Sequence, residues 1–150
     1  MVYKIMVPHD GTDMSDRALE EATRFAKAFG EEIVLVHIVE EISIPTTLTP
    51  DGHNFLNQAK KNITVELINW WENLAKAKML EIEKKDVRVT SKCLIGKAAE
   101  SIIRFAKENQ IEIIIMGSRR FRGVPEIMSL GSVARKVSEN AECNVLIVHH

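Results

Sequence analysis

Five short apolar runs, separated from one another by helix-length stretches, constrain the fold of this chain more than any other feature. They predict strands over residues 2–7, 32–39, 87–96, 111–116 and 144–149. The third run alternates apolar and polar side chains from Val87 and ends at Gly96. The fourth, IEIIIM, is the most apolar and is therefore expected in the middle of the sheet.

Between these runs the apolar side chains recur every three or four residues, which predicts helices. The expected helices span about residues 15–29, 54–84, 98–109 and 132–139. Gly30 is placed to end the first of them. The stretch before the second helix, from Glu40 to about His53, is rich in proline, glycine and threonine and is expected to form a loop. Trp70 and Trp71, within the second helix, are expected to pack against the core.

The alternation of strands and helices predicts the fold class: one α/β domain over residues 1–150, with an open five-stranded parallel sheet and helices on both faces. Ligands of such sheets bind beyond the carboxyl ends of the strands, where the strand order switches direction. The loops at residues 8–15 and 117–131 are both expected at that edge.

The composition argues against several functional classes. With 20 basic and 21 acidic side chains, the formal charge is −1, which argues against nucleic acid or an anionic membrane as a partner. The apolar run in MVYKIMVPHD is too short for a signal peptide or a spanning helix. Cys93 and Cys143 form no metal-binding or disulfide pattern. We therefore expect a cytoplasmic protein with no nucleic-acid or membrane partner.

The stretch VPHDGTDMS is the first candidate binding loop. Pro8 and Gly11 end the strand sharply, which places Asp10 at the sheet edge. There its carboxylate could accept hydrogen bonds from a ribose or from an adenine amino group. The same carboxylate could instead cap the first helix, and Asp13 and Ser15 are expected to be caps. Both roles of Asp10 stay open on the sequence alone.

The stretch from IIIMG to LGSVARKV is the second candidate. Gly117 leaves a buried strand and would let the backbone approach a ligand. Gly131 and Ser132 open a helix whose free N–H groups and dipole favour an anion, although Ser132 could simply be the helix cap. The spacing matches neither a Walker loop nor the G-x-G-x-x-G fingerprint.

Other catalytic or metal-binding patterns are not recognisable. There is no Ser-His-Asp, Cys-His or paired-carboxylate arrangement, and His9, His37 and His53 do not form a metal constellation. We therefore expect no catalytic residue and no metal held by the protein itself.

Taken together, these motifs resemble those of the universal stress proteins. VPHDGTDMS is similar to the family's V-P-x-D-G-[ST]-x-x-S opening, and LIGKAAESIIRFA to its G-x-x-x-x-x-I-x-x-x-A segment. IIIMGSR and LGSVARKV are similar to its fourth strand and the helix start that follows. NVLIVHH resembles the terminal strand, which often mediates homodimerisation in the family. The resemblance covers the chain apart from residues 40–85 and implies a Rossmann-like fold of the adenine nucleotide alpha hydrolase kind.

In one subgroup of this family, bound ATP is marked by G-x-x-G, nine residues and then G-[ST]. Carried over to this chain, the resemblance implies a nucleotide site made of Pro8, His9, Asp10, Ile38, Met116, Gly117, Ser118, Arg119, Arg120, Gly131, Ser132, Val133 and Ala134. The base and ribose would lie against residues 8–10 and Ile38. The phosphates would meet backbone N–H groups at residues 117–118 and 131–133.

Arg120 departs from the subgroup pattern, because it stands where the second glycine is expected. Residues 121–130 also make the loop one residue longer than the pattern. A positive φ at an arginine would cost about 1 kcal/mol, whereas a charge-assisted contact with phosphate contributes about 1.5–3 kcal/mol. Two outcomes stay open: Arg119, Arg120 and Arg122 could contact a polyphosphate, or a long side chain could fill its place.

The sequence thus favours a homodimeric universal stress protein that binds ATP or AMP as a regulatory ligand, with Mg²⁺ as a candidate companion of the nucleotide. The dimer would form through the terminal strand, Asn144 to His149, and ATP hydrolysis would be slow at most. The alternative is a dimeric interaction module of the same fold that has lost nucleotide and acts through its middle loop and long helix. An adenylating enzyme is disfavoured, because no S-G-G-x-D-S run occurs.

Overall fold

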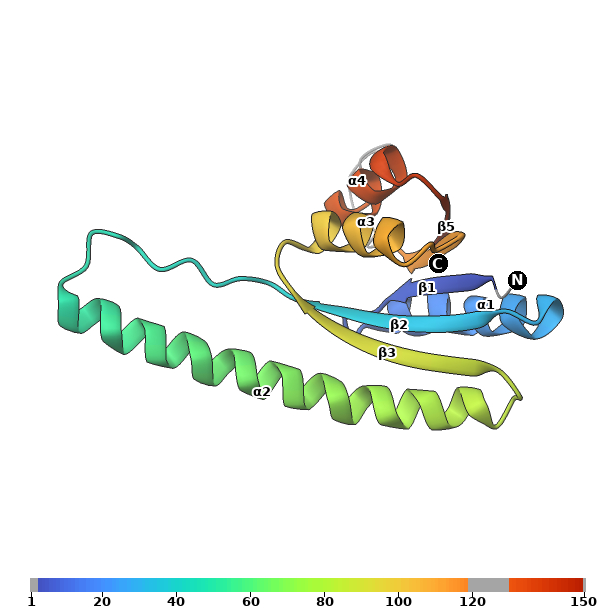
Figure 1. Ribbon diagram of the computed structural model, residues 1–150, viewed down its shortest axis with the longest axis horizontal. Coiled ribbons are helices and arrows are strands. Elements are labelled where there is room, and N and C mark those ends of the chain that lie inside the picture. Colours follow the sequence, from blue (N-terminus) through green and yellow to red (C-terminus); the bar gives the residue numbers. More distant parts are fainter. Residues whose placement is uncertain (1–2, 119–129, 150) are drawn as a thin grey trace.

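The described residues form a single parallel sheet of five strands in the order β3-β2-β1-β4-β5. The computed structural model describes residues 3–118 and 130–149. Its strands are β1 (Lys4–Pro8), β2 (Glu32–Val39), β3 (Arg88–Ile95), β4 (Ile113–Gly117) and β5 (Asn144–Val148). Its helices are α1 (Asp13–Phe29), α2 (Pro50–Glu83), α3 (Ala98–Glu108) and α4 (Ser132–Asn140). The predicted fold class, an open parallel α/β sheet, is confirmed (Figure 1).

β1, and not β4, is the middle strand of the sheet. Ile5 of β1 lies opposite Ile33 of β2 on one side and opposite Ile113 of β4 on the other. β4 lies one place nearer the edge, between β1 and β5. The prediction that the most apolar run, β4, is the middle strand was wrong. Apolar content indicates that a strand is buried on both faces, and β1 and β4 are both buried in this way.

Helices cover both faces of the sheet (Figure 1). Leu19 of α1 and Trp71 of α2 belong to one buried cluster with side chains of β1 and β2. Ile102 of α3 and Val137 of α4 belong to a second cluster on the opposite face. Because successive side chains of a strand point to opposite faces, each inner strand contributes to both clusters. The core is therefore two apolar layers separated by the sheet.

Helix α2 begins earlier than predicted. The structure starts it at Pro50, where the side chain of Thr49 accepts a hydrogen bond from the Gly52 N–H. A proline is tolerated in the first turn because its missing N–H would have no partner within the helix. The sequence predicts a loop at Pro50 and Gly52, but in the structure both residues belong to the capped start of the helix.

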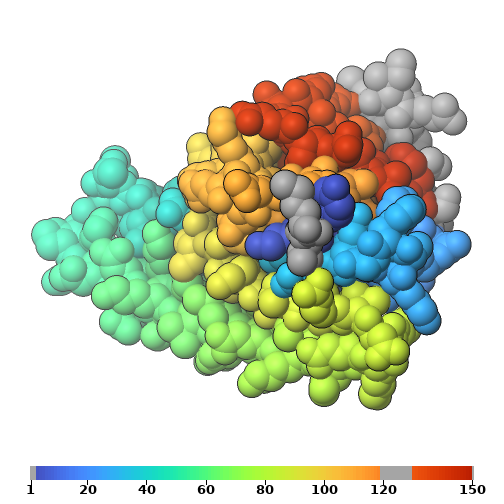
Figure 2. Space-filling view, turned by 45° about the vertical axis from the view of Figure 1, so that its right-hand side comes forward, coloured from blue at the N-terminus to red at the C-terminus, as the bar shows by residue number. Residues whose placement is uncertain are grey.

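The N-terminal part of α2 extends beyond the sheet together with the segment before it (Figures 1 and 2). We call residues 40–70 the arm. Only three residues of α2 are buried, Trp71, Ala75 and Ile82, and all three lie beyond the arm. Despite the length of α2, no helix among the described residues has an apolar stretch long enough to cross a membrane.

Replacing Trp71 with alanine is expected to lower the free energy of unfolding by about 3–5 kcal/mol, because the indole is 1% exposed and joins α2 to the sheet. The matched control is Leu80→Ala on the same helix, whose side chain is 59% exposed and which should change stability by less than about 0.5 kcal/mol. Urea unfolding followed by circular dichroism measures both. Equal losses in the two variants would contradict this packing of α2.

Candidate functional site

A cavity of about 470 Å³ opens at the carboxyl edge of the sheet. Its walls come from the ends of β1, β2 and β4 and from the first turns of α3 and α4. The strand order switches at this point, since the chain continues from β1 to β2 on one side while β4 lies on the other. The two candidate loops of the sequence therefore meet at the place where open α/β sheets bind their ligands.

The structure brings most of the predicted site residues together around this cavity. Those that line it are Pro8, His9, Asp10, Ile38, Met116, Gly117, Gly131, Ser132, Val133 and Ala134. Ser118 is not among them: it is buried, its N–H donates to the Val148 carbonyl at 3.2 Å, and its hydroxyl has no hydrogen-bond partner among the described residues. Arg119, Arg120 and Arg122 lie outside the described residues.

Six further residues line the cavity that the sequence did not assign to the ligand site: Ser15, Val36, His37, Glu40, Ala98 and Ile102. The signal for those on β2 was available, because the carboxyl ends of parallel strands lie at one edge of a sheet. The contribution of α3 was harder to foresee. It depends on α3 and α4 lying side by side on the same face, which follows from the strand order.

Asp10 is the acceptor of a hydrogen-bonded turn at the cavity wall. Its Oδ1 accepts from the Thr12 N–H at 3.1 Å, from the Thr12 hydroxyl at 2.6 Å and from the Ser15 hydroxyl at 2.6 Å. Thr12 is the cap of α1, because its side chain accepts from the Ser15 N–H. The expectation that Asp13 and Ser15 are caps was wrong, since α1 starts at Asp13 and both residues lie within its first turn.

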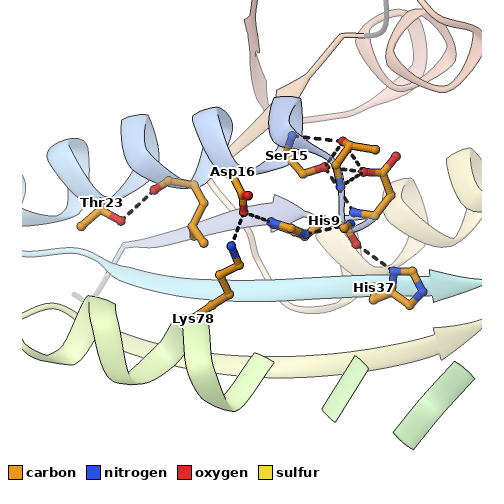
Figure 3. A network of polar contacts seen from close by, with 10 residues as sticks. His9, Ser15, Asp16, Thr23, His37 and Lys78 are labelled. Atoms are coloured by element: carbon orange, nitrogen blue, oxygen red, sulfur yellow. Dashed lines mark hydrogen bonds and ion pairs between the residues drawn. The ribbon is translucent and has the colours of Figure 1, made fainter. Parts of the chain in front are cut away.

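A chain of polar contacts connects α2 to this loop (Figure 3). The Lys78 ammonium lies 2.5 Å from Oδ1 of Asp16, and Nε2 of His9 lies 2.8 Å from the same oxygen. On the other side of the buried imidazole, Nδ1 of His9 accepts from the Gly11 N–H at 3.0 Å. Helix α2 therefore reaches the binding loop through two side chains.

His37 and two tryptophans add a second connection between α2 and the loop. Nδ1 of His37 lies 2.8 Å from the His9 carbonyl, and the His37 ring stacks on Trp71 with ring centroids 5.0 Å apart. Trp70 meets the same ring edge-on and also covers Gly11, where an added Cβ would lie 2.8 Å from the indole. Gly11 has a φ of 85°. Both the turn and the packing of α2 therefore require glycine at this position.

The electrostatics of the chain favour a neutral histidine beside a charged carboxylate. Burial lowers the pKa of His9 below its usual value, and the Lys78 ammonium adds to this effect while Asp16 and Asp10 oppose it. Partial burial by itself would raise the pKa of Asp16. The hydrogen bonds from Lys78 and His9 outweigh that effect, so the pKa of Asp16 lies below its usual value.

The first turn of α4 forms the wall opposite Asp10. Gly131 is its N-cap and Ser132 is its first helical residue, so the reading of Ser132 as the cap was wrong. No side chain among the described residues caps this turn. The N–H groups of Ser132, Val133 and Ala134 have no acceptor within the helix and lie at the positive end of its dipole.

Gly117 has a packing role that the sequence did not indicate. A Cβ at this position would lie 2.7 Å from the carbonyl oxygen of Met14, because the first turn of α1 crosses the end of β4. Close approach is therefore the reason for the glycine, as predicted, but the group that approaches is the protein's own backbone.

The two sides of the cavity differ in chemistry. Asp10 and Glu40 supply carboxylates on one side, and the start of α4 supplies N–H donors on the other. Apolar side chains, including Ile38 and Met116, lie on the wall as well. Such a cavity suits a ligand that combines a ring, hydroxyl groups and an anion. Within residues 3–118 and 130–149, no group of three His, Cys, Asp or Glu side chains is placed to hold a metal ion.

Comparison with known proteins shows relatives over the full length of the chain. The model of the universal stress protein family matches residues 1–149. Universal stress protein YxiE of Bacillus subtilis is 35% identical over 153 aligned residues, which cover 99% of this chain and 99% of that protein. Universal stress protein MJ0577 of Methanocaldococcus jannaschii is 30% identical and covers 99% of this chain and 95% of its own length.

Solved structures share the fold. The structure of MJ0577 superposes with a TM-score of 0.80 at 23% identity, covering 100% of this chain and 97% of that one. A universal stress protein in complex with cAMP and one from Archaeoglobus fulgidus in complex with dAMP have TM-scores of 0.63 and 0.60, each at 19% identity. They cover 99% and 98% of this chain and 97% of their own. Because the family model and two curated relatives all match nearly its whole length, this chain belongs to the universal stress protein family.

Proposed function

We propose that this protein binds an adenine nucleotide, ATP or AMP, in the cavity between β1 and β4, and that the nucleotide acts as a regulatory ligand in a stress response. The observation that carries this proposal is that one cavity is lined both by the Asp10 turn and by the first turn of α4, which no side chain in the described part of the chain caps. A nucleotide offers ribose hydroxyl groups to the Asp10 turn and phosphate to the start of α4. The complexes of two proteins of this fold with cAMP and dAMP support an adenine nucleotide as the ligand.

The phosphates would lie at the start of α4. Backbone N–H groups of Ser132, Val133 and Ala134 would donate to the phosphate oxygens, and the helix dipole would favour their negative charge. The Ser132 hydroxyl could donate as well, because Gly131, and not Ser132, is the helix cap. Contact of Arg119 and Arg120 with the polyphosphate, one of the two outcomes that the sequence leaves open, would supply further positive charge.

The nucleoside would occupy the other side of the cavity. Ile38 and Met116 offer apolar surface to a purine ring. The Asp10 carboxylate is already oriented by the Thr12 and Ser15 hydroxyls, so a ribose hydroxyl would meet an acceptor that needs little further ordering. Binding would therefore use groups that are in place before the ligand arrives.

We propose binding rather than turnover, with slow ATP hydrolysis at most. His9 lines the cavity, but both of its ring nitrogens are hydrogen-bonded within the protein, to Asp16 and to Gly11, and are therefore not available as a base. Mg²⁺ would arrive with the nucleotide and be held largely by its phosphates. The proposal places this binding in the cytoplasm, where the free thiols of Cys93 and Cys143 would stay reduced.

Replacing Ser132 with aspartate is expected to weaken the binding of ATP and AMP at least about tenfold. A carboxylate at the first position of α4 would repel the phosphate and compete for the same N–H groups. The fold should persist, because a negative charge in this position stabilises the helix. Isothermal titration at pH 7.5 gives the affinities.

The matched control is Ser132→Asn, which has the size of aspartate without its charge and should retain most of the affinity. Adenosine, which carries no phosphate, should bind Ser132→Asp and the parent protein alike. If ATP, ADP and AMP give neither heat nor a thermal shift at millimolar concentration, the proposed function is wrong. If both variants weaken ATP binding equally, the phosphate does not lie at α4.

We further propose that the protein is a homodimer formed through β5. This strand lies at the edge of the sheet and pairs with β4 on one side, so its other side can pair with a second copy. A different observation favours the alternative function, an interaction module that acts through the arm. Phe55, Ile63 and Val65 on the arm are 72%, 48% and 54% exposed, which is unusual for large apolar side chains on one helix.

Two arginine substitutions separate these possibilities. Ile147→Arg, on β5, is expected to convert a dimer into a monomer in sedimentation velocity, whereas Ile63→Arg, on the arm, should leave the dimer intact. Thermal unfolding checks that each variant is folded. The reverse outcome, with only Ile63→Arg dissociating the dimer, would assign self-association to the arm and contradict the role of β5.

A further inference from the structure

All the polar groups of His9 are hydrogen-bonded. Its backbone N–H donates to the Val36 carbonyl at 2.8 Å, and its carbonyl accepts from Nδ1 of His37 at 2.8 Å. In the ring, Nε2 lies 2.8 Å from Oδ1 of Asp16, and Nδ1 lies 3.0 Å from the Gly11 nitrogen. His9 therefore connects the end of β1 to β2, to α1 and to the turn that carries Asp10.

These partners permit only one protonation state of the ring. The Gly11 N–H can only donate, so Nδ1 must offer a lone pair. The ionised Asp16 carboxylate can only accept, so Nε2 must carry the hydrogen. The contacts around His9 are thus those of the neutral imidazole protonated at Nε2.

The bond to Gly11 holds the turn in which Asp10 lies. Asp10 stands directly between His9 and Gly11, and Gly11 adopts a φ of 85° that few residues other than glycine reach. Fixing the Gly11 N–H therefore fixes the backbone on both sides of Asp10. The position of the Asp10 carboxylate at the cavity depends on that backbone.

Protonation of His9 would break this bond. A hydrogen on Nδ1 would face the hydrogen of the Gly11 N–H, and the side chain of His9 is 1% exposed, so water could not easily replace the lost acceptor. The contact with Asp16 would survive, but Lys78 already shares the same carboxylate oxygen. Protonation would thus gain little on one side of the ring and lose a bond on the other.

The charged groups that face the ring come from three elements. They are Asp16 on α1, Lys78 on α2 and Asp10 in the turn itself. Burial, the largest influence, lowers the pKa of His9, so protonation falls on the acid side of the usual value of 6.5. His37 from β2 contacts the backbone of this turn, where its Nδ1–H donates to the His9 carbonyl.

We propose that His9 is a proton-sensitive positioning residue: in its neutral form it holds the Pro8–Thr12 turn ready for a ligand, and on protonation it releases that turn and weakens ligand binding. This inference rests on the proposed function, because the affected ligand is the nucleotide in the same cavity. It adds a regulatory input, which is acidification of the surroundings. That input acts through His9, whose carboxylate partner Asp16 lies seven residues further along the chain.

The direction of the effect follows from proton linkage. The bound state favours neutral His9, so affinity is highest above the pKa of His9 in the free protein. As the pH falls through that pKa, affinity drops by at most about tenfold per pH unit, until the pKa of the bound state is passed. The folded protein also resists protonation more than the unfolded chain. Stability contributed by His9 is therefore complete above pH 6.5 and declines as the pH falls below it.

The test compares the protein with two variants of His9. In His9→Asn the amide oxygen lies near the place of Nδ1, can accept from the Gly11 N–H and does not titrate. In His9→Leu that acceptor is lost. At pH 7.5 we expect His9→Leu to bind AMP about three- to tenfold more weakly than the parent protein, and His9→Asn to restore most of that loss.

Isothermal titration with AMP from pH 7.5 to 5 then isolates the contribution of His9. The AMP phosphate ionises near pH 6, but it does so equally with every variant, so the difference between the parent protein and His9→Asn belongs to His9. We expect the affinity of the parent protein to fall more steeply than that of His9→Asn. In nuclear magnetic resonance spectra of the ligand-free protein, the chemical shift of the Gly11 amide should change with pH. The midpoint of that change should equal the midpoint of the titration of the His9 ring.

Three results would overturn the inference or its basis. A Gly11 amide that does not follow the titration of the His9 ring would contradict the coupling. Equal pH dependence of AMP affinity in the parent protein and His9→Asn would contradict the effect on the ligand. If the Gly11 amide follows His9 while no nucleotide binds at any pH, the proposed function fails and the coupling within the free protein stands.

Discussion

The structure depends on β1 lying in the middle of the sheet, with a hydrogen-bonded neighbour on each side and a helix layer on each face. Its central residues, Ile5, Met6 and Val7, have no exposed surface. Because all strands are parallel, the connections cross over the faces as helices and the carboxyl ends meet at one edge. The cavity lies where β1 ends, and the ends of β2 and β4 and the starts of α3 and α4 complete its wall.

Helix α2 has a larger part in the site than its place in the sequence suggests. It covers the sheet with Trp71, presses Trp70 against Gly11 and extends Lys78 to Asp16, so that three of its side chains support one turn. The same helix carries the exposed apolar side chains of the arm. The two alternative functions therefore involve different parts of one helix: the arm at its N-terminal end, and the side chains from Trp70 to Lys78 that contact the turn and its partners.

The sequence predicted the elements well and their contacts less well. The bounds of β2 agree with the prediction because a continuous apolar run between polar ends has few alternatives. The start of α2 was missed because Pro50 and Gly52 usually indicate loops, whereas the Thr49 cap makes them a helix start. The middle strand was predicted to be β4 and is β1, because apolarity does not distinguish two strands that are both buried on both faces.

The candidate site divides in the same way. Residues adjacent to glycine and proline turns, such as Asp10 and Gly131, could be placed at the cavity because strand ends locate them. The bond between His9 and Asp16 could not, since it spans seven residues, and Lys78 lies 62 residues after its partner. Such contacts depend on how helices pack on the sheet, which periodicity does not reveal.

The central claim is that the cavity at the end of β1 holds an adenine nucleotide with its phosphate at α4. Amide chemical shifts measured during a titration with AMP test it most directly. The account predicts saturable shifts at Gly11, Gly117, Val133 and Ala134, and none at residues 83–88 at the opposite edge of the sheet. An absence of saturable shifts at these four amides, or saturation at residues 83–88 instead, would contradict it.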